Sequence, residues 1–522
     1  MRLAKVIIVL LILLTIIISI RHYGGTADPA EYRVMWVFGF GEFANPRATS
    51  TMINTLAHSN FNVVIPEIRK YGDAYYDSAY EPMARDVRDG YDPLDDIITK
   101  AHKRDMEVWA WIVTYRIWPR RTSPPPTHVW ARHPEWACLD NAGSNQVGSY
   151  YNLDPGVPGV QQYVCDVVKD IITKYTDLDG FTFDYIRYES YTWGYNAISK
   201  ERFRSEYGYY PPTNTTDAHW STWCDWKRRQ VTDLVKKCYL EANYINPKIK
   251  MTAATIGWPG GNPNTDFTGT CAYKEVCQDH EGWMKQGIVD ANILMNYNRD
   301  WIGLRAPSYS YKGHHFGNEQ ANHRLWSDWL ASMQTATGRH SIDGIGGYLN
   351  IMQGTLDQWE YSRANGIGLG MYRHGLTIGQ EDPANPGLPM LSDKKLVPGS
   401  ESLFYKTIRS TMFQRPAPIP DMPWKSRPST GIIFGQVTNA AKPNDPTYQN
   451  WVYKAKVEIK GPFTYRTGTD ATGTFGFLNL PPGAYAVTCS KSGFAAETYK
   501  TQTIAVGEVL RHDFAIQPLN RR

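Results

Sequence analysis

The feature of this sequence that most constrains its fold is a regular alternation of short apolar runs with segments of helical periodicity. Apolar residues recur at helical spacing between residues 161 and 172, and a buried run at 178–184 follows them directly. A helix that feeds a buried strand is half of a βα repeat. The strands predicted from these repeats cover residues 32–40, 61–69, 107–113, 178–184, 250–256, 291–297, 345–349 and 367–372.

Predicted strands that alternate with helices in this way favour one closed architecture. They extend over roughly 380 residues, and a (β/α)8 TIM barrel takes about 250 residues plus insertions. A doubly wound open sheet is the alternative, but it more often carries a glycine-rich nucleotide fingerprint after its first strand, and Gly39-Phe40-Gly41 does not complete one. We therefore predict an α/β fold with a (β/α)8 barrel over residues 30–414.

A change of composition near residue 415 predicts a second, smaller domain. Residues 415–430 are rich in proline, which favours an extended and fairly stiff linker. The pattern beyond them is short alternating runs separated by turn residues, and about 85 residues of this kind predict a small all-β sandwich over residues 431–518. The alternating runs lie at 432–437, 454–459, 473–477 and 484–488.

The amino terminus bears on the compartment. A short basic region, Met1 to Lys5, precedes an apolar stretch from Val6 to Ile20. We expect residues 1–23 to be a signal peptide or an uncleaved membrane anchor, because the run is short for a span of about 20 residues and no clear cleavage site follows it. Either alternative predicts that the remaining chain is exported, and is then secreted or held at the membrane by this segment.

Charge and composition restrict the partner. The chain carries 55 Lys and Arg against 51 Asp and Glu, and no basic run stands out, which argues against nucleic acid. The 18 Trp and 34 Tyr are compatible with stacking on sugars, although most such rings build a core and its rim. The cysteines and histidines follow no metal-ligand spacing, so we expect no catalytic metal and no other cofactor.

The acid that ends the fourth predicted strand is the first candidate for chemistry. Side chains alternate along a strand, so Phe181 and Phe183 share a face suited to covering helices, while Thr182 and Asp184 share the other. Barrel enzymes keep their catalytic residues at the carboxyl ends of the strands. On position alone, Asp184 is as well explained by a cap of the following turn as by catalysis.

Ordered motifs run through the large domain from about Arg33 to Arg373. They are NVVIPEIR at 62–69 with GDAYYDS at 72–78, DPL at 92–94, AHKRDMEVWAW at 101–111, HPEW at 133–136, NLDPG at 152–156 and DGFTFDYIRY at 179–188. In this order and spacing they resemble the family-10-like glycosyl hydrolases, a group of exported barrel proteins. The resemblance implies a glycosidase barrel with a functional Asp184, and peptidoglycan-type glycans are one substrate option.

The chain departs from that family at two positions and carries an added tail. The family usually has Gln where this chain has Glu67, which adds a carboxylate, and often Pro where it has Glu189, which alters the loop after Asp184. The tail from Gly431 resembles a carboxypeptidase regulatory-like domain through GQV at 435–437 and GTFGF at 473–477. Such domains are non-catalytic accessory modules.

Glycoside hydrolysis usually takes two carboxyl groups, one as proton donor and the other as nucleophile or as base for water. We predict that Asp184 is the nucleophile or base. Glu67 shares strand parity with Arg69, whose guanidinium would lower the pKa of the Glu67 carboxyl and suit it to be a base. Asp300 follows the sixth strand and is the candidate proton donor. For Glu67 and Asp300 alike, the alternative is an ion pair in a loop.

Polar and aromatic residues at or just past the predicted strand ends form the expected glycan cleft, although each of them is also compatible with a structural role. Asp73 and Tyr75 are expected to bind sugar hydroxyls. The predicted substrate-binding residues are Arg69, Asp73, Tyr75, Tyr115, Arg116, Arg187, Tyr188, Asn296, Tyr297, Tyr372 and His374.

The sequence therefore predicts an exported glycoside hydrolase that cleaves a polysaccharide or cell-wall glycan by a two-carboxylate mechanism. One alternative is a catalytically inactive carbohydrate-binding or surface-adhesion protein. A transglycosylase that uses the same carboxylates is another.

Overall fold

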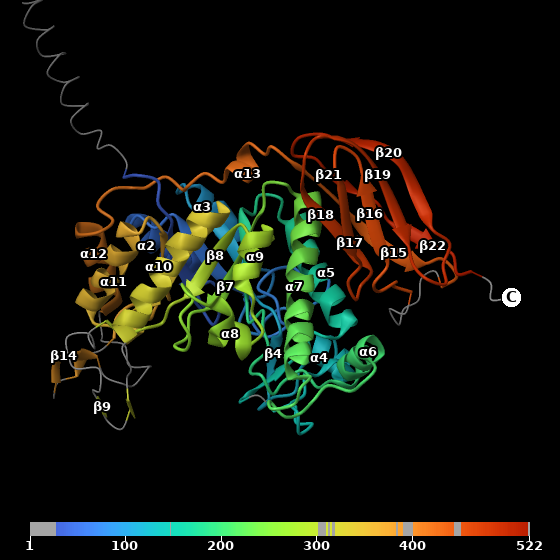
Figure 1. Cartoon of the computed structure of the whole chain (residues 1–522). Helices are drawn as coiled ribbons and strands as arrows, with labels where there is room; N and C mark the ends of the chain where they lie inside the picture. Colours follow the sequence, from blue (N-terminus) through green and yellow to red (C-terminus); the bar gives the residue numbers. More distant parts are fainter. Residues whose placement is uncertain are drawn as a thin grey trace, which may run out of the picture.

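Eight parallel strands close into a barrel in the order β1-β12-β11-β8-β7-β6-β3-β2 (Figure 1). The computed structural model describes residues 28–146, 148–300, 310–311, 314–315, 319–379, 381–382, 385–389, 400–442 and 450–519. The barrel confirms the predicted fold class. Its strands are β1 (Arg33–Val37), β2 (Val63–Arg69), β3 (Glu107–Val113), β6 (Gly180–Asp184), β7 (Lys250–Ile256), β8 (Ala291–Met295), β11 (His340–Gly346) and β12 (Gly368–Tyr372).

Helices connect these strands and cover the outside of the barrel. The start of α3 shows the local signals well, because the Asp92 side chain accepts a hydrogen bond of 3.2 Å from the Asp95 N–H and Pro93 opens the first turn. The larger helices are α2 (Pro46–His58), α3 (Pro93–His102), α5 (Pro158–Lys174), α6 (Ala197–Tyr207), α7 (Trp220–Ile245), α9 (His280–Gln286), α10 (Glu319–Thr337), α11 (Met352–Ala364) and α12 (Ser400–Ser410).

Strand β6 has the predicted division of its two faces. Phe181 and Phe183 are fully buried in the apolar layer that contains Val164 and Val168 of α5. On the opposite face, the Thr182 hydroxyl lies 2.7 Å from the Thr252 hydroxyl of β7, inside the barrel. This alternation directs the carboxyl of Asp184 towards the interior at the end of the strand.

The barrel interior is filled by inward-pointing apolar side chains from neighbouring strands, among them β1, β2 and β3. Trp36 of β1 is one of the largest, and two glycines make room for it. A Cβ atom on Gly344 of β11 would lie 2.9 Å from the Trp36 ring, and one on Gly370 of β12 would lie 3.0 Å from it. The glycines in these two strands therefore permit close approach of a tryptophan.

The seventh barrel strand differs from the prediction. It covers His340–Gly346, whereas residues 347–349, expected to be part of it, form a short 3-10 turn. The outward face of β11 carries polar side chains in place of the apolar ones that mark a buried strand. Ser341 donates a hydrogen bond of 2.9 Å to the Leu330 carbonyl, and the Asp343 carboxylate accepts one of 2.8 Å from Ser327.

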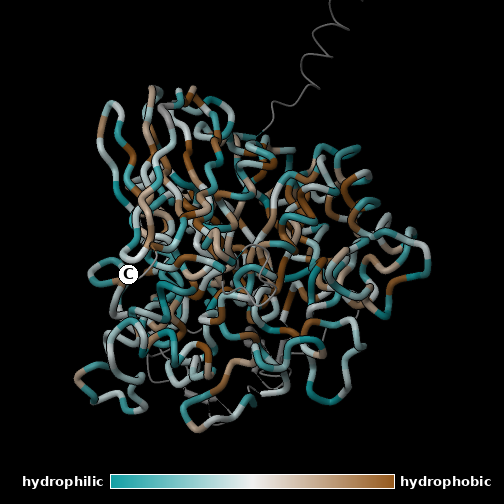
Figure 2. The backbone as a smooth tube through the Cα atoms, turned by 90° about the vertical axis from the view of Figure 1, so that its right-hand side faces the viewer, coloured by the Kyte–Doolittle hydropathy of each residue, from teal (hydrophilic) through white to brown (hydrophobic). Residues whose placement is uncertain are grey.

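The chain beyond the barrel forms two packed sheets, the first mixed and the second antiparallel. One contains β18, β15 and β21, with β22 also pairing with β15, and the other has the order β17-β16-β19-β20. Hydrophobic and hydrophilic positions alternate along these strands (Figure 2). The bounds are β15 (Gly431–Asn439), β16 (Lys456–Lys460), β17 (Thr464–Gly468), β18 (Thr474–Leu480), β19 (Gly483–Ser490), β20 (Glu497–Ile504), β21 (Val509–Arg511) and β22 (Phe514–Ile516).

This sandwich packs against α7 of the barrel domain (Figure 1). The buried ammonium of Lys237 donates hydrogen bonds of 2.9 and 3.0 Å to the hydroxyls of Thr472 and Thr474. The guanidinium of Arg511 pairs with the Glu241 carboxylate at 3.0 Å. Polar contacts from several strands therefore fix the sandwich on the outside of the barrel, away from the mouth.

The signal peptide or membrane anchor predicted at residues 1–23 lies outside the described residues. Within the described part of the chain, no helix combines the length and apolar composition needed to cross a bilayer.

Candidate active site

A cavity of about 380 Å³ opens at the carboxyl ends of the barrel strands. Its volume falls in the range of about 300–1,000 Å³ that is usual for small-molecule sites. Aromatic, acidic and basic side chains line it together. They are Phe38, Glu67, Lys70, Tyr71, Trp111, Val113, Arg116, Tyr150, Asp184, Tyr185, Arg187, Ile256, Trp258, Met295, Tyr297, Tyr348 and Tyr372.

Two carboxyl groups, Glu67 and Asp184, come to this cavity from strands on either side of β3. The register pairs Glu67 of β2 with Trp111 of β3, and Trp111 with Thr182 of β6, so Asp184 lies two residues nearer the mouth. Two steps of strand spacing separate the backbones of β2 and β6 by roughly 10 Å. Both side chains line the same cavity, and the negative charge of Asp184 acts on the Glu67 carboxyl.

Glu67 is in an environment that favours its protonated form. Burial raises the pKa of the Glu67 carboxyl well above its usual range, and the negative charge of Asp184 raises this pKa further. The Gly39 N–H, which donates a hydrogen bond of 3.1 Å to Oε2, and the ammonium of Lys70 oppose the shift without reversing it. A carboxylic acid of this kind is suited to donate a proton.

The predicted influence of Arg69 on Glu67 is wrong. The register between β2 and β3 shifts between Glu67 and Arg69, and this irregularity breaks the simple alternation of side chains. Arg69 consequently lies outside the barrel, where its guanidinium pairs with Glu81 at 2.7 Å. It does not line the cavity, and the pKa of Glu67 is raised rather than lowered.

Asp184 has more groups that favour its charged form. Burial raises the pKa of the Asp184 carboxyl, but two N–H donors and the charges of Arg187 and Arg116 act against this rise. Oδ1 accepts a hydrogen bond of 2.7 Å from the Tyr185 N–H, and Oδ2 accepts one of 3.1 Å from the Trp111 Nε1–H. One oxygen therefore caps the following turn while the other faces the cavity wall, so the capping and catalytic interpretations are compatible.

Glu189 organises the cationic side of the cavity. Its carboxylate pairs with Arg116 at 3.2 Å and with Arg187 at 3.4 Å. Arg116 also donates a hydrogen bond of 2.7 Å to the Tyr185 hydroxyl. The residue that replaces the family's common proline thus holds two guanidinium groups beside Asp184.

The other predicted site residues divide into two groups. Arg116, Arg187, Tyr297 and Tyr372 line the cavity, but Asp300 does not. The Asp300 N–H donates a hydrogen bond of 2.8 Å to the Asn350 side chain, and a side-chain hydrogen bond links Asp300 to Gln320 of α10. The remaining predicted substrate-binding residues that lie outside the cavity lining are Arg69, Asp73, Tyr75, Tyr115, Tyr188, Asn296 and His374.

These residues miss the cavity because side-chain alternation ends with the strand. Tyr115 and Tyr188 follow strand ends and turn into the apolar layer outside the barrel. Asn296 donates a hydrogen bond of 3.0 Å to the His323 carbonyl, and His374 lies 3.0 Å from Glu401. Tyr75 donates one of 2.7 Å to Asp86, beside the cavity rather than into it.

Several lining residues were missed by the sequence reasoning. Trp111 could have been predicted from side-chain alternation, because Trp111 and Val113 are two residues apart and share the inward face of β3. Tyr150 has no such signal, since it begins β5 (Tyr150–Asn152), which pairs with β4 (Arg116–Pro119) in an insertion after β3. The Tyr150 hydroxyl lies 3.1 Å from that of Tyr71, and together they form one wall.

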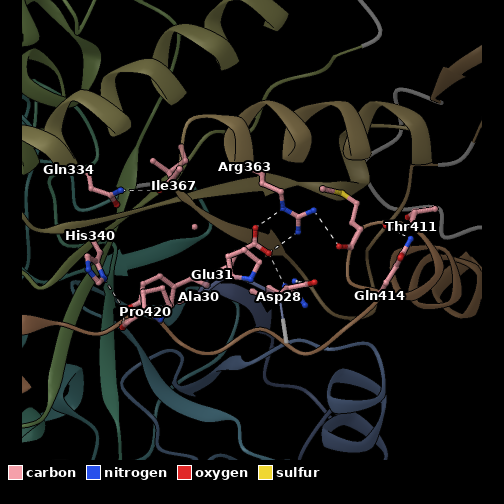
Figure 3. A pocket seen from close by; sticks show the side chains of 16 residues that line it. Asp28, Ala30, Glu31, Gln334, His340, Arg363, Ile367, Thr411, Gln414 and Pro420 are labelled. Carbon is pink, nitrogen blue, oxygen red and sulfur yellow. Dashed lines mark hydrogen bonds and ion pairs between the residues drawn. The ribbon is translucent and has the colours of Figure 1, made fainter. Parts of the chain in front are cut away.

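A larger cavity, of about 580 Å³, lies at the opposite end of the barrel (Figure 3). Its charged side chains are paired with one another. Arg363 donates hydrogen bonds of 2.6 and 2.7 Å to Glu31, and Arg33 donates one of 2.8 Å to Asp28. These pairs fix the chain entering β1 and leaving α12 at the base of the barrel, so the carboxylate pair at the mouth is the better candidate site.

The closed barrel and the two buried carboxyl groups at its mouth define an α/β barrel protein with a paired-carboxyl cavity. The family model described as glycosyl hydrolase-like 10 matches residues 31–324, and that of the carboxypeptidase regulatory-like domain matches residues 433–517. The chain belongs to the glycosyl hydrolase-like 10 family.

Curated relatives agree with this family. Glycosyl hydrolase YngK of Bacillus subtilis is 25% identical over an alignment of 342 residues that covers 60% of this chain and 63% of the relative. Glycosyl hydrolase DigH of Escherichia coli K12 is 27% identical over an alignment of 264 residues that covers 46% of this chain and 56% of the relative. The chain therefore spans less than two thirds of the length of these relatives.

Among solved structures, the catalytic domain of a beta-amylase from Paenibacillus polymyxa is similar with a TM-score of 0.47 and 12% identity. The match covers 73% of this chain and 100% of that chain.

Proposed function

We propose that this protein is a glycoside hydrolase in which Glu67 donates a proton and Asp184 is the nucleophile or base. The observation that carries the proposal is a pair of buried carboxyl groups in one cavity at the carboxyl ends of β2 and β6. Their environments differ, because Asp184 has two N–H donors and two neighbouring guanidiniums, whereas Glu67 has one N–H donor and Lys70. Such divergence separates acid from base in catalytic carboxyl pairs.

The reaction follows from these two protonation states. As the glycosidic bond breaks, the Glu67 proton moves to the leaving oxygen, and the Glu67 carboxylate remains. The Asp184 carboxylate either attacks the anomeric carbon or removes a proton from the water that attacks it. In the first case the Glu67 carboxylate then deprotonates the water that releases the sugar, which restores both groups.

The proposed substrate is a polysaccharide or cell-wall glycan. Tyrosine hydroxyls and guanidinium groups in the cavity match the hydroxyls of a sugar, and the family and its named relatives are glycosyl hydrolases. Export directed by residues 1–23 belongs to the same proposal, because it would bring the enzyme to such a glycan. The resemblance to the family keeps peptidoglycan-type glycans as one option.

The alternative of an inactive carbohydrate-binding protein is less well supported. It would suit an Asp184 without a second carboxyl group near it, but Glu67 lines the same cavity and the charge of Asp184 raises the pKa of Glu67. The glycosidase proposal explains why both are buried there.

Release of reducing ends from a panel of glycans by the wild type and by Asp184→Asn tests the proposal. General acid or base removal typically costs about 10²- to 10⁴-fold in rate, so we expect a loss of at least about 100-fold in the variant. Equal product release by both proteins would show that Asp184 is not catalytic. Glycan binding without hydrolysis by the wild type would support the inactive binding protein, and products longer than the substrate would indicate a transglycosylase.

A further inference from the structure

Phe40, just after β1, combines two unfavourable features. Its ring is 53% exposed, and its backbone has a φ of 62°, in the left-handed region that bulky side chains rarely adopt. A residue that is both exposed and strained persists only where the surroundings hold it, and such positions cluster at functional sites.

The surroundings of Phe40 hold its ring at the rim of the cavity. The Phe40 N–H donates a hydrogen bond of 3.2 Å to the Tyr75 hydroxyl, which also contacts the Lys70 ammonium. That ammonium lies 3.4 Å from the centre of the Phe40 ring and covers one face of it. The rings of Phe38 and Tyr71, which line the cavity, lie 5.1 and 6.1 Å from it.

Trp258, just after β7, has a similar arrangement on the other side of the mouth. It lines the cavity, it is 38% exposed, and the guanidinium of Arg187 lies 5.3 Å from the centre of its ring. Strands β1 and β7 are opposite one another in the closed order of the barrel. Glu67 comes from the neighbour of β1 and Asp184 from the neighbour of β7, so the two exposed rings bracket the carboxyl pair.

We propose that Phe40 and Trp258 are sugar-stacking platforms on opposite sides of the bond that is cleaved. Each ring has a cation beside it and remains partly exposed to solvent, so the apolar face of a pyranose can stack on the exposed part. A glycan that contacts both rings crosses the cavity and extends beyond it in both directions. The protein would therefore cleave within a chain, in preference to removing end units. The cleavage position rests on the proposed function, whereas the binding does not.

The test uses full-length Glu67→Gln protein, so that binding is measured without turnover. Calorimetry with neutral and N-acetylated oligosaccharides, from disaccharide to hexasaccharide, gives the affinity as a function of chain length. We expect Phe40→Gly and Trp258→Ala, each added to this background, to weaken binding of the longest chains by about tenfold or more and to affect disaccharides much less. Phe40→Tyr keeps the ring and should bind like the parent.

Two controls separate lost stacking from lost folding. Phe463, in the sandwich, is 61% exposed, and Phe463→Gly should leave the affinity unchanged. Phe40→Gly relieves the left-handed backbone of a bulky residue, so its melting temperature should equal or exceed that of the parent.

Unchanged affinity for long chains in Phe40→Gly and Trp258→Ala would overturn the inference, as would a Glu67→Gln parent that binds no oligosaccharide of any length. Phe40-dependent binding to lipid vesicles or to a protein in place of glycans would overturn it too. If the parent binds long glycans through both rings but the wild type hydrolyses none, the proposed function fails and the platforms stand.

Discussion

Trp111→Phe is expected to change the protonation of Asp184 without opening the barrel. The substitution keeps an aromatic ring on the inward face of β3. It removes the indole N–H that donates a hydrogen bond of 3.1 Å to Oδ2 of Asp184. The acceptor is buried, so water does not replace the donor freely. Since the N–H favours the carboxylate, its loss raises the pKa of Asp184 further.

The size of the effect follows from the type of hydrogen bond. A hydrogen bond to a charged group contributes about 1.5–3 kcal/mol, and about 1.4 kcal/mol corresponds to one pH unit. The reaction requires Asp184 to be ionised, so activity falls on the acid side of the pH–rate profile. We expect the acid limb of kcat/KM to move upward by about one to two pH units, with activity largely recovered at higher pH.

Trp109→Phe is the matched control. Trp109 lies on the same face of β3, two residues earlier, and its indole N–H donates 2.9 Å to Glu107 at the base of the barrel. The Trp109→Phe variant loses a similar hydrogen bond far from Asp184, so the acid limb of its kcat/KM profile should lie at the same pH as in the wild type. An unchanged limb in Trp111→Phe, or the same displacement in both variants, would refute the argument that this indole tunes Asp184.

Two further predictions concern stability. Asp290 is buried, accepts hydrogen bonds of 2.8 Å from the Met251 N–H and 2.7 Å from the Trp424 indole, and lies 3.2 Å from the Arg339 guanidinium. Removal of this buried partner by Asp290→Ala should lower the free energy of unfolding, measured by urea titration, by about 3–5 kcal/mol. The control Asp421→Ala removes an exposed ion pair and should cost much less than Asp290→Ala, and equal costs would contradict this account. Burial raises the pKa of Glu206, but contacts with Lys454, Tyr453 and Arg229 outweigh it and lower the pKa to about 2. Its stabilisation is therefore present above the unfolded pKa of about 4.3 and lost as the pH falls towards 2, and melting curves of Glu206→Gln should lack this part of the pH dependence.

The alternation of strands and helices made the barrel predictable, because apolar periodicity directly reflects burial. The faces of β6 followed from the same rule, and they placed Asp184 correctly at the mouth. The seventh strand was misplaced because Ser341 and Asp343 are buried through hydrogen bonds with neighbouring helices, a compensation that hydropathy does not reveal.

The candidate site was less predictable, since it depends on the backbone beyond regular strands. The irregularity between Glu67 and Arg69 sends two residues of equal parity to opposite sides of the barrel wall. Tyr150 reaches the cavity only through the pairing of β5 with β4, which no local pattern announces. Asp300 also lies beyond the end of its strand, β8. Its backbone N–H and the nearby Asn296 side chain form hydrogen bonds outside the cavity.

The central claim is that Glu67 and Asp184 form the catalytic pair. The most direct test measures hydrolysis by the variants Glu67→Gln, Asp184→Asn and Asp300→Asn. Each variant is given a natural glycan and an aryl glycoside of the same sugar with a good leaving group. We predict that Glu67→Gln loses about 10²- to 10⁴-fold on the glycan but little on the aryl glycoside, whose leaving group needs no proton. Asp184→Asn should lose both activities, and Asp300→Asn, outside the cavity, should lose neither. Full activity of Glu67→Gln or Asp184→Asn on the glycan, or selective loss in Asp300→Asn, would contradict a catalytic pair made of Glu67 and Asp184.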